Sequence, residues 1–467
     1  MQIPDVSVHL RNENPTITEG RGTHMRRNGL TRREFLGKTS AGLAAASVIP
    51  RGAPAVSGNP NALALHGGTP VRTKPYPTWP QTSELDEQYI LKSLRNHRWC
   101  TFDGEFIPKF EKAWGEKVGA GGCVMTPCGT HALHMAVELL GIGPGDEVLV
   151  SPFTYIATID AIMLSYALPV FVDTDLRTFQ MDPADIEHRI TEHTRAILPV
   201  HILGNASNMD EILAIAQRHN LPIIEDACQG QLAEWRGKKL GTLGTIGCFS
   251  FQESKIIPGG EAGALVSNDP ELIDKAYSFR DFGGDQKGHR GYIMRGTKYR
   301  ISDFAAAVLM AQLTRLDDVC ATREKHAAHL RNELRNFPGL MPQDHYPPTT
   351  RRNYYVFGLR YDPEHFNGLA RAEFIRAMHA EGIPVGGIYP PMNKEPFLEA
   401  SFNSRGFRAV FSQDRLAKYR AQNNCPNNDK LCATCLGISH EVLIGTQRDV
   451  DDVIEACAKV QKYAATA

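Results

Sequence analysis

One lysine, Lys255, follows the apolar stretch 247–251 and precedes the glycine-containing stretch 259–263. Aromatic residues and glycines are poor surroundings for a solvated surface charge. An amine that condenses with a carbonyl must be partly desolvated, so that it is neutral for part of the time. Glycines let the backbone pass close to a bulky bound group. These features predict that Lys255 reacts as an amine beside a bound ligand.

A carboxylate ends another short apolar stretch, 221–226, which closes with Glu225 and Asp226. A buried parallel strand with a carboxylate at its C-terminal end lies where open α/β sheets bind ligands. An acid and an amine at separate strand ends suit pyridoxal phosphate (PLP). The lysine forms a Schiff base with it, and the acid keeps its pyridine nitrogen protonated. Lys255 and Asp226 therefore predict PLP as the cofactor.

Two further stretches offer a phosphate site and an aromatic ring. Gly129 and Thr130 stand where a turn runs into a helical pattern, and the free N–H groups of a helix start bind phosphate. Tyr155 follows the apolar strand 147–150 and can stack on a cofactor ring. Both features are typical of a site for a phosphorylated aromatic ligand.

In this order and spacing, the four stretches resemble the DegT/StrS family of PLP-dependent sugar and cyclitol aminotransferases. The resemblance covers nearly everything from residue 63 to residue 460. It implies that Lys255 is the Schiff-base lysine and Asp226 the partner of the pyridine nitrogen. The remaining PLP contacts that it implies are Gln229 beside the phenolic oxygen, Tyr155 stacked on the ring, and Gly129, Thr130 and Ser250 around the phosphate.

The resemblance also implies a homodimer with a shared active site. In the family, the segment that corresponds to 296–303 reaches the cofactor phosphate of the partner subunit, usually through an asparagine. This chain has Lys298 there, and a lysine binds phosphate as a point charge. We therefore expect Lys298 to contact the phosphate of the neighbouring subunit.

Short apolar stretches alternate with helical patterns from residue 123 to residue 264, which predicts a mostly parallel, helix-covered sheet. With the resemblance, the expected fold is α/β, the PLP-dependent transferase fold type I (aspartate aminotransferase-like). It has a large domain with a mixed, mostly parallel sheet and a smaller C-terminal α+β domain. The strands are expected at 148–151, 168–172, 196–200, 223–225, 247–251 and 263–266.

Three parts are expected along the chain. They are an N-terminal extension (1–60), a large PLP-binding domain (61–315) and a small C-terminal domain (316–467). The 467 residues include 51 Lys+Arg and 52 Asp+Glu, so charge provides no case for binding nucleic acid. No apolar stretch is long enough to span a membrane.

The N-terminal extension resembles a twin-arginine export signal. Arg32 and Arg33 precede an Ala-rich run (41–49), and 53–55 is a candidate cleavage site. We expect a periplasmic or otherwise exported protein; the alternative is a basic tail on a cytoplasmic protein. A second methionine, Met25, leaves the true start open.

Three acidic residues and one histidine could take part in chemistry, but a structural role would also explain them. Asp173 and Asp175, with Asp182 nearby, could bind a metal, but turn acids and a helix cap are the favoured interpretation. His201 either borders the active site or is a core histidine. We expect no metal at these positions.

Three cysteines near His440 invite a zinc interpretation, but their spacing is irregular. A disulfide among them after export stays open. The cysteines are Cys425, Cys432 and Cys435, and most of the chain's ten cysteines are expected to be reduced core residues.

The expected activity is amino transfer from glutamine or glutamate to a keto-cyclitol or ketosugar. The stretches 63–72, 252–255, 389–391 and 439–446 resemble the cyclitol-type members, such as the glutamine:scyllo-inosose aminotransferases. A nucleotide-sugar acceptor would need cationic groups for its diphosphate, and Arg351–Arg352 is the one candidate. The residues are also compatible with a non-catalytic PLP-binding or sensing protein of the envelope. Family dehydratases replace the lysine with histidine, so Lys255 argues against a dehydratase.

Overall fold

The computed structural model describes residues 62–286 and 291–466. These residues belong to one compact unit that spans 50–467. The expected twin-arginine segment and Met25 lie outside the described residues. Within the described part of the chain, no helix is both long and apolar enough to cross a bilayer.

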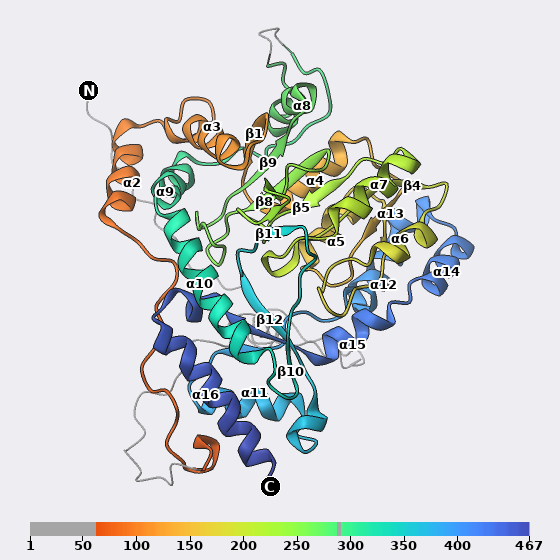
Figure 1. The fold of residues 1–467 in the computed structure, drawn as a ribbon. Helices are drawn as coiled ribbons and strands as arrows, with labels where there is room; N and C mark the ends of the chain where they lie inside the picture. The colour runs from red at the N-terminus through yellow and green to blue at the C-terminus, as the bar shows by residue number, and fades with distance from the viewer. Residues whose placement is uncertain (1–61, 287–290, 467) are drawn as a thin grey trace, which may run out of the picture. The chain divides into compact units, whose positions relative to one another are not determined.

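A four-stranded group and a three-stranded group make up the central sheet (Figure 1). Parallel bridges from Ile197 to Ile223 and from Val200 to Asp226 join the two groups. The strands are β1 (Gly122–Thr126), β2 (Glu147–Val150), β3 (Leu168–Phe171), β4 (Thr194–Leu198), β5 (Ile224–Asp226), β8 (Ile246–Ser250) and β9 (Gly263–Ser267).

The order across the sheet is β3-β2-β4-β5-β8-β9-β1. Strand β9 is antiparallel to β8 and β1, while the β3–β2, β2–β4 and β5–β8 pairs are parallel. The mixed, mostly parallel sheet that the sequence predicts is therefore confirmed. Each expected strand lies within two residues of an observed one.

Apolar side chains on both faces of the sheet explain its uninterrupted hydrophobic strands. Val148 and Val150 pack with helix α4 (Gly129–Leu139) and helix α5 (Ile156–Met163) in one core. Leu149, between them, packs with helix α7 (Met209–His219) in another core. Successive side chains of a strand point to opposite faces, so a strand buried on both faces needs apolar residues throughout.

Helices and short elements complete the sheet's surroundings. Helix α2 packs against α9, and α9 packs against α3. The bounds are α2 (Glu84–Asn96), α3 (Phe106–Val118), α6 (Pro183–Arg189), α8 (Pro270–Arg280), α9 (Asp303–Leu313), β6 (Glu234–Trp235), β7 (Lys238–Lys239), β11 (Thr349–Arg351), η2 (Ile202–Gly204), η3 (Pro363–Phe366), η4 (Met392–Lys394) and η5 (His440–Ile444).

A second, antiparallel sheet forms in the C-terminal part, in the order β10-β12-β14-β13. Its core holds apolar residues of three helices, among them Leu330, Phe374 and Val453. This agrees with the expected α+β composition, while the boundary at residue 315 stays a prediction. The elements are β10 (Leu340–Pro342), β12 (Val356–Tyr361), β13 (Val385–Gly386), β14 (Cys435–Ser439), α10 (Leu316–Leu334), α11 (Arg371–Ala380) and α16 (Gln447–Ala464).

One part of the C-terminal region packs against the central sheet instead, which the sequence does not anticipate. Four helices between residues 396 and 434 contribute to the core that also holds Phe171. The Tyr419 hydroxyl donates to the Pro169 carbonyl at 2.8 Å. Figure 1 shows these helices beside α5 and α6. They are α12 (Pro396–Phe402), α13 (Arg405–Val410), α14 (Gln413–Gln422) and α15 (Pro426–Thr434).

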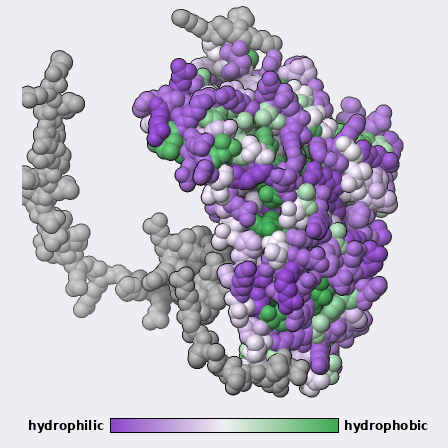
Figure 2. Space-filling view, turned by 60° about the vertical axis from the view of Figure 1, so that its left-hand side comes forward, coloured by the Kyte–Doolittle hydropathy of each residue, from purple (hydrophilic) through white to green (hydrophobic). Residues whose placement is uncertain are grey.

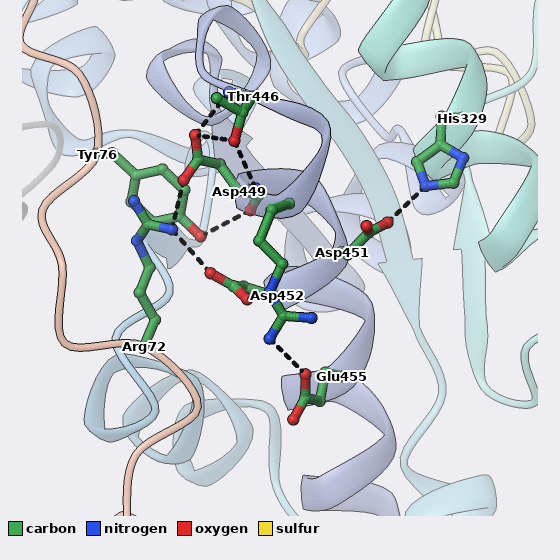
Figure 3. Close-up of polar contacts among 9 residues, drawn as sticks. Arg72, Tyr76, His329, Thr446, Asp449, Asp451, Asp452 and Glu455 are labelled. Atoms are coloured by element: carbon green, nitrogen blue, oxygen red, sulfur yellow. Dashed lines mark hydrogen bonds and ion pairs between the residues drawn. The ribbon is translucent and has the colours of Figure 1, made fainter.

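Residues 63–80, here called the strap, lead into the fold and are tied to helix α16 (Figure 3). Arg72 Nη1 lies 2.6 Å from Asp449 Oδ1 and 2.8 Å from Asp452 Oδ2. Its guanidinium also lies over the Tyr76 ring, 3.8 Å from the centroid. Because all three ion-pair side chains are buried, the contact joins the strap firmly to α16. We call these residues the Arg72 clamp.

Candidate active site

Lys255 lies in a loop beyond the end of β8, outside any helix or strand. Its backbone N–H donates to the Gln252 carbonyl at 2.8 Å, and its own carbonyl accepts from Trp79 Nε1 at 3.1 Å. The amine nitrogen lies 4.3 Å from the centroid of the Tyr355 ring. The lysine is half-buried, so its amine is partly desolvated against an aromatic face.

Asp226 ends strand β5 and is buried. Its Oδ2 accepts from the Thr158 hydroxyl at 2.7 Å and its Oδ1 from the Cys228 N–H at 3.1 Å. No lysine, arginine or histidine of the described residues forms an ion pair with it. A buried carboxylate held by neutral donors alone favours a positive charge placed against it.

The charges of Asp226 and Lys255 both act on the thiol of Cys228. Burial, followed by the Asp226 charge, raises the pKa of Cys228 well above its usual value, and the Lys255 charge opposes this shift. The structure therefore places Lys255 and Asp226 near the same thiol, as expected for two parts of one site.

Gln229 is fixed between two loops. Its Nε2 donates to the Tyr389 hydroxyl at 2.8 Å, and its Oε1 accepts from the Leu203 N–H at 2.8 Å. Burial, followed by the neighbouring Tyr355, raises the pKa of Tyr389, so this phenol stays neutral and can donate its own hydrogen bond. Gln229 and Tyr389 form a polar pair near Asp226, whose charge further raises the pKa of Tyr389.

The start of helix α4 has the geometry expected of a phosphate cradle, and its binding role stays a prediction. Cys128, the N-cap, is extended and its side chain caps no backbone N–H. A Cβ on Gly129 would lie 2.8 Å from both Ser250 Cβ and Cys228 Sγ. Only glycine therefore fits this approach, which brings the helix start against Ser250. Thr130 follows in the first turn, where N–H groups have no intrahelical partner.

Tyr155 and Lys298 are exposed on the single chain. Tyr155 is the N-cap of α5 and is 51% exposed. Lys298 pairs through its backbone with Asp281. Exposure is compatible both with a contact to a second subunit and with a plain surface position, so the role of Lys298 stays a prediction.

These features fit PLP. A helix start with free N–H groups and a glycine that allows close approach suit a phosphate. The uncompensated carboxylate of Asp226 suits a protonated ring nitrogen. An exposed tyrosine ring, Tyr155, is available for stacking.

The other candidate residues have structural partners. Asp182 caps α6 by accepting from the Ala184 N–H at 3.0 Å, and Asp173 accepts from the N–H groups of Asn427 and Asn428 at the start of α15. The cap interpretation is confirmed. Within the described residues, no group of three or more histidine, cysteine or acidic side chains could hold a metal ion.

His201 is a core histidine. Its Nε2 lies 2.9 Å from Glu225 Oε2, and its Nδ1 accepts from the Ser207 N–H at 3.2 Å. The cysteines form no disulfide in the described part of the chain, and all ten are free thiols. Cys425, Cys432 and Cys435 are buried.

Sequence reasoning missed four residues that surround Lys255 and Gln229. A signal existed for Tyr389, because the stretch 389–391 resembles a substrate loop of the family. Nothing in the local pattern distinguishes the other three from core aromatic residues. The four are Trp79, Tyr355, Tyr389 and His440.

The chain is similar to known aminotransferases. A profile of the DegT/DnrJ/EryC1/StrS aminotransferase family matches residues 80–458. The L-glutamine:2-deoxy-scyllo-inosose aminotransferase of Streptoalloteichus tenebrarius is 34% identical over 418 residues, 86% of this chain and 98% of that protein. Its counterpart of the same name in Streptomyces kanamyceticus is 33% identical over 420 residues, 86% of this chain and 97% of that protein.

Solved structures of related proteins have a fold similar to that of this chain. The 3-amino-5-hydroxybenzoic acid synthase has a TM-score of 0.75 and 27% identity, covering 85% of this chain and 100% of that one. DesV of S. venezuelae has a TM-score of 0.68 and 29% identity, covering 81% of this chain and 94% of that one.

Proposed function

The chain belongs to the DegT/DnrJ/EryC1/StrS aminotransferase family and is a PLP-dependent aminotransferase, and from this premise we propose its substrates. The amino donor is glutamine or glutamate. The acceptor is the keto group of a free cyclitol or ketosugar. The names of the two relatives, which contain glutamine and a scyllo-inosose, support this choice.

The state of Arg351 and Arg352 carries the proposal of a free acceptor. Arg351 Nε lies 2.6 Å from Glu324 Oε1. Arg352 is buried, and its Nη2 donates to Gln343 Oε1 at 2.7 Å. A nucleotide-linked acceptor brings a diphosphate, which needs several unoccupied cationic or N–H donors. Both arginines that the sequence offers for this purpose already have partners, which supports an acceptor without a diphosphate.

The chemistry divides between cofactor and chain. PLP, when bound, supplies a ring that accepts electrons. Asp226, buried and without a cationic partner, holds a proton on a nitrogen placed against its carboxylate. Lys255 would hold the cofactor through its amine, and once the donor's amine had replaced it there, the freed Nζ would move a proton from the donor's Cα and return one to the acceptor's carbon. Tyr155 and Gln229 orient the ring.

The role of Lys255 is tested with borohydride and a Lys255→Ala variant. The purified enzyme should be yellow, and reduction should attach the cofactor to Lys255, as peptide mass spectrometry will show. We expect Lys255→Ala to lose at least about 10³-fold in donor turnover. A variant with unchanged absorbance and turnover would refute this assignment.

The acceptor is tested by steady-state rates on scyllo-inosose and on a nucleotide-linked 4-ketosugar, with glutamine as donor. We expect a clear preference for scyllo-inosose. The opposite preference would reject the proposed acceptor and leave the aminotransferase chemistry intact.

We further propose a homodimer in which Lys298 reaches the partner's cofactor phosphate. Large apolar side chains exposed on α2 and on two nearby stretches support a covering partner, and Figure 2 shows apolar (green) residues exposed in its upper half. Sedimentation should give a dimer, and Lys298→Ala should weaken PLP binding. An active monomer would contradict this. The exposed residues are Ile90, Leu91, Leu94, Trp99, Phe102, Phe282, Tyr292 and Ile293.

Export through the twin-arginine route is likewise a proposal, supported by Arg32 and Arg33 in the sequence. The machinery is selective for the arginine pair itself, so replacing both with lysine should retain the enzyme in the cytoplasm with its cofactor. Equal envelope fractions for wild type and variant would refute it.

A further inference from the structure

The loop that carries Lys255 is held by side chains far away in the sequence. Trp79 Nε1 donates to the Lys255 carbonyl at 3.1 Å, across 176 residues. The Ser254 backbone lies close enough to the His440 ring to oppose, in part, the lowering of that ring's pKa by burial. The Ser254 hydroxyl lies 2.9 Å from the Tyr355 hydroxyl. The Lys255 carbonyl therefore has a ring N–H as partner, and the preceding Ser254 lies beside a second ring.

Trp79 and His440 are fixed in turn by a buried arginine. The guanidinium carbon of Arg323 lies 4.7 Å from the centroid of the Trp79 ring. Its Nη2 lies 2.9 Å from His440 Nδ1. The rings of Trp79 and His440 meet edge to face, with centroids 5.0 Å apart. Arg323 is fully buried, so water does not compete for these contacts.

The protonation of His440 follows from the same contacts. Burial, followed by the charges of Arg323 and Lys255, holds the pKa of His440 well below its usual value. Arg323 can only donate, so Nδ1 of the neutral ring must be the acceptor. The proton of the ring then resides on Nε2, the nitrogen available to donate toward the Ser254 backbone.

The strap connects this arrangement to the far end of the molecule. Trp79 lies near the C-terminal end of the strap, and the Arg72 clamp binds the strap to α16 (Figure 3). Glu381 adds contacts to the N–H groups of Ala64 and Val71 at 2.8 and 2.9 Å. The strap is thus anchored before it reaches the lysine loop.

We propose that Trp79 and His440 are positioning residues for Lys255, a role that rests on the proposed catalytic function of that lysine. The loop 252–257 lies outside helix and strand, so sheet hydrogen bonds do not fix it. The indole N–H on the Lys255 carbonyl, together with the His440 ring that packs against Trp79 and lies beside Ser254, fixes the backbone from which the amine extends. An amine displaced by about 1 Å costs up to about 10²-fold in rate, so these contacts affect turnover although neither ring is assigned a contact with substrate.

The first test is Trp79→Phe, which removes the indole N–H and keeps an aromatic ring. The matched control is Trp235→Phe, because the Nε1 of this buried tryptophan also donates to an acceptor far away in the sequence, Asp210 Oδ1, at 2.8 Å. In the cofactor-free protein, amide exchange of 252–260 should be about 5-fold faster in Trp79→Phe and unchanged in the control. With cofactor, kcat should fall about 10- to 100-fold while the donor KM changes less than about 3-fold.

The second test uses the conservative variant His440→Gln, whose amide N–H lies near the position of Nε2, and His440→Phe, which has no donor. We expect His440→Gln to retain most of the wild-type kcat and the slow exchange of 252–260, and His440→Phe to lose both. Equal behaviour of the two His440 variants, or equal exchange in the two tryptophan variants, would overturn the proposal. Failure of the Lys255 assignment is detected separately by an active Lys255→Ala enzyme.

Discussion

Two neighbouring acids on strand β5, Glu225 and Asp226, lie in two regions of different character. Glu225 accepts from the N–H groups of Gly241, Leu243 and Gly244 at 2.6–2.8 Å and contacts His201 at 2.9 Å. Asp226 accepts from only two neutral donors, the Thr158 hydroxyl and the Cys228 N–H. Both carboxylates are buried.

The difference shows that burial alone does not mark a functional acid. A carboxylate has about four acceptor positions. Those of Glu225 are occupied by its own fold, so it holds loops together. Asp226 keeps unused acceptor capacity beside Lys255, and a buried charge with unused capacity is suited to a ligand.

The proposed difference between the two acids would be refuted if their substitutions had similar effects on activity and stability. We expect Asp226→Asn to fold normally, to bind PLP and to lose about 10³- to 10⁴-fold in kcat/KM, about 4–5.5 kcal/mol. Glu225→Gln should keep kcat/KM within about 3-fold but lose about 2–4 kcal/mol in the free energy of unfolding, since backbone N–H groups lose their acceptor. Urea unfolding and steady-state kinetics on both variants decide this; reversed effects would contradict the assignment.

The Arg72 clamp applies the same rule at a third place, because the charge of Arg72 is fully paired. We expect Arg72→Met to lose about 3 kcal/mol in the free energy of unfolding, since Asp449 and Asp452 keep buried charges. The exposed pair of Arg218 and Glu187 offers the control Arg218→Met, which should leave the urea midpoint almost unchanged, because solvent screens an exposed ion pair. Similar midpoints in urea for the two variants would disprove this.

Acid pH should destabilise the fold through His440. This histidine lies beside the loop that carries Lys255 and has no acid as partner among the described residues. Its pKa in the folded chain is well below the usual 6.5. Above pH 6.5 the ring is neutral in both states. Below it the unfolded chain binds a proton that the folded chain does not, so the free energy of unfolding falls by up to about 1.4 kcal/mol per pH unit.

Urea unfolding of wild type and His440→Gln between pH 7.5 and 5.5 measures this contribution. The variant should lose stability less steeply as the pH falls. Parallel curves would show that His440 titrates normally.

The smallest effect is expected at Arg351. Because it is paired with Glu324 and assigned no substrate contact, Arg351→Ala should change kcat/KM for scyllo-inosose by less than about 2-fold. A loss of more than about 10-fold, confined to nucleotide-linked acceptors, would reinstate the diphosphate interpretation.

The sequence alone determined the sheet and predicted which residues form the chemical core of the site. Strands buried on both faces need continuous apolar stretches, and such stretches are legible without a structure. Lys255, Asp226 and the Gly129 turn each follow directly from such local patterns. Local patterns also identified Asp182 as a helix cap, since capping depends on residues two positions apart.

Only the tertiary structure decided what surrounds Lys255 and which part of the chain covers the sheet. Trp79 meets Lys255 across 176 residues, and Tyr389 meets Gln229 across 160. Periodicity predicts which face of an element is buried and contains no information on the partner that buries it. For the same reason the helices between 396 and 434 read as part of the C-terminal domain, although they pack on the central sheet.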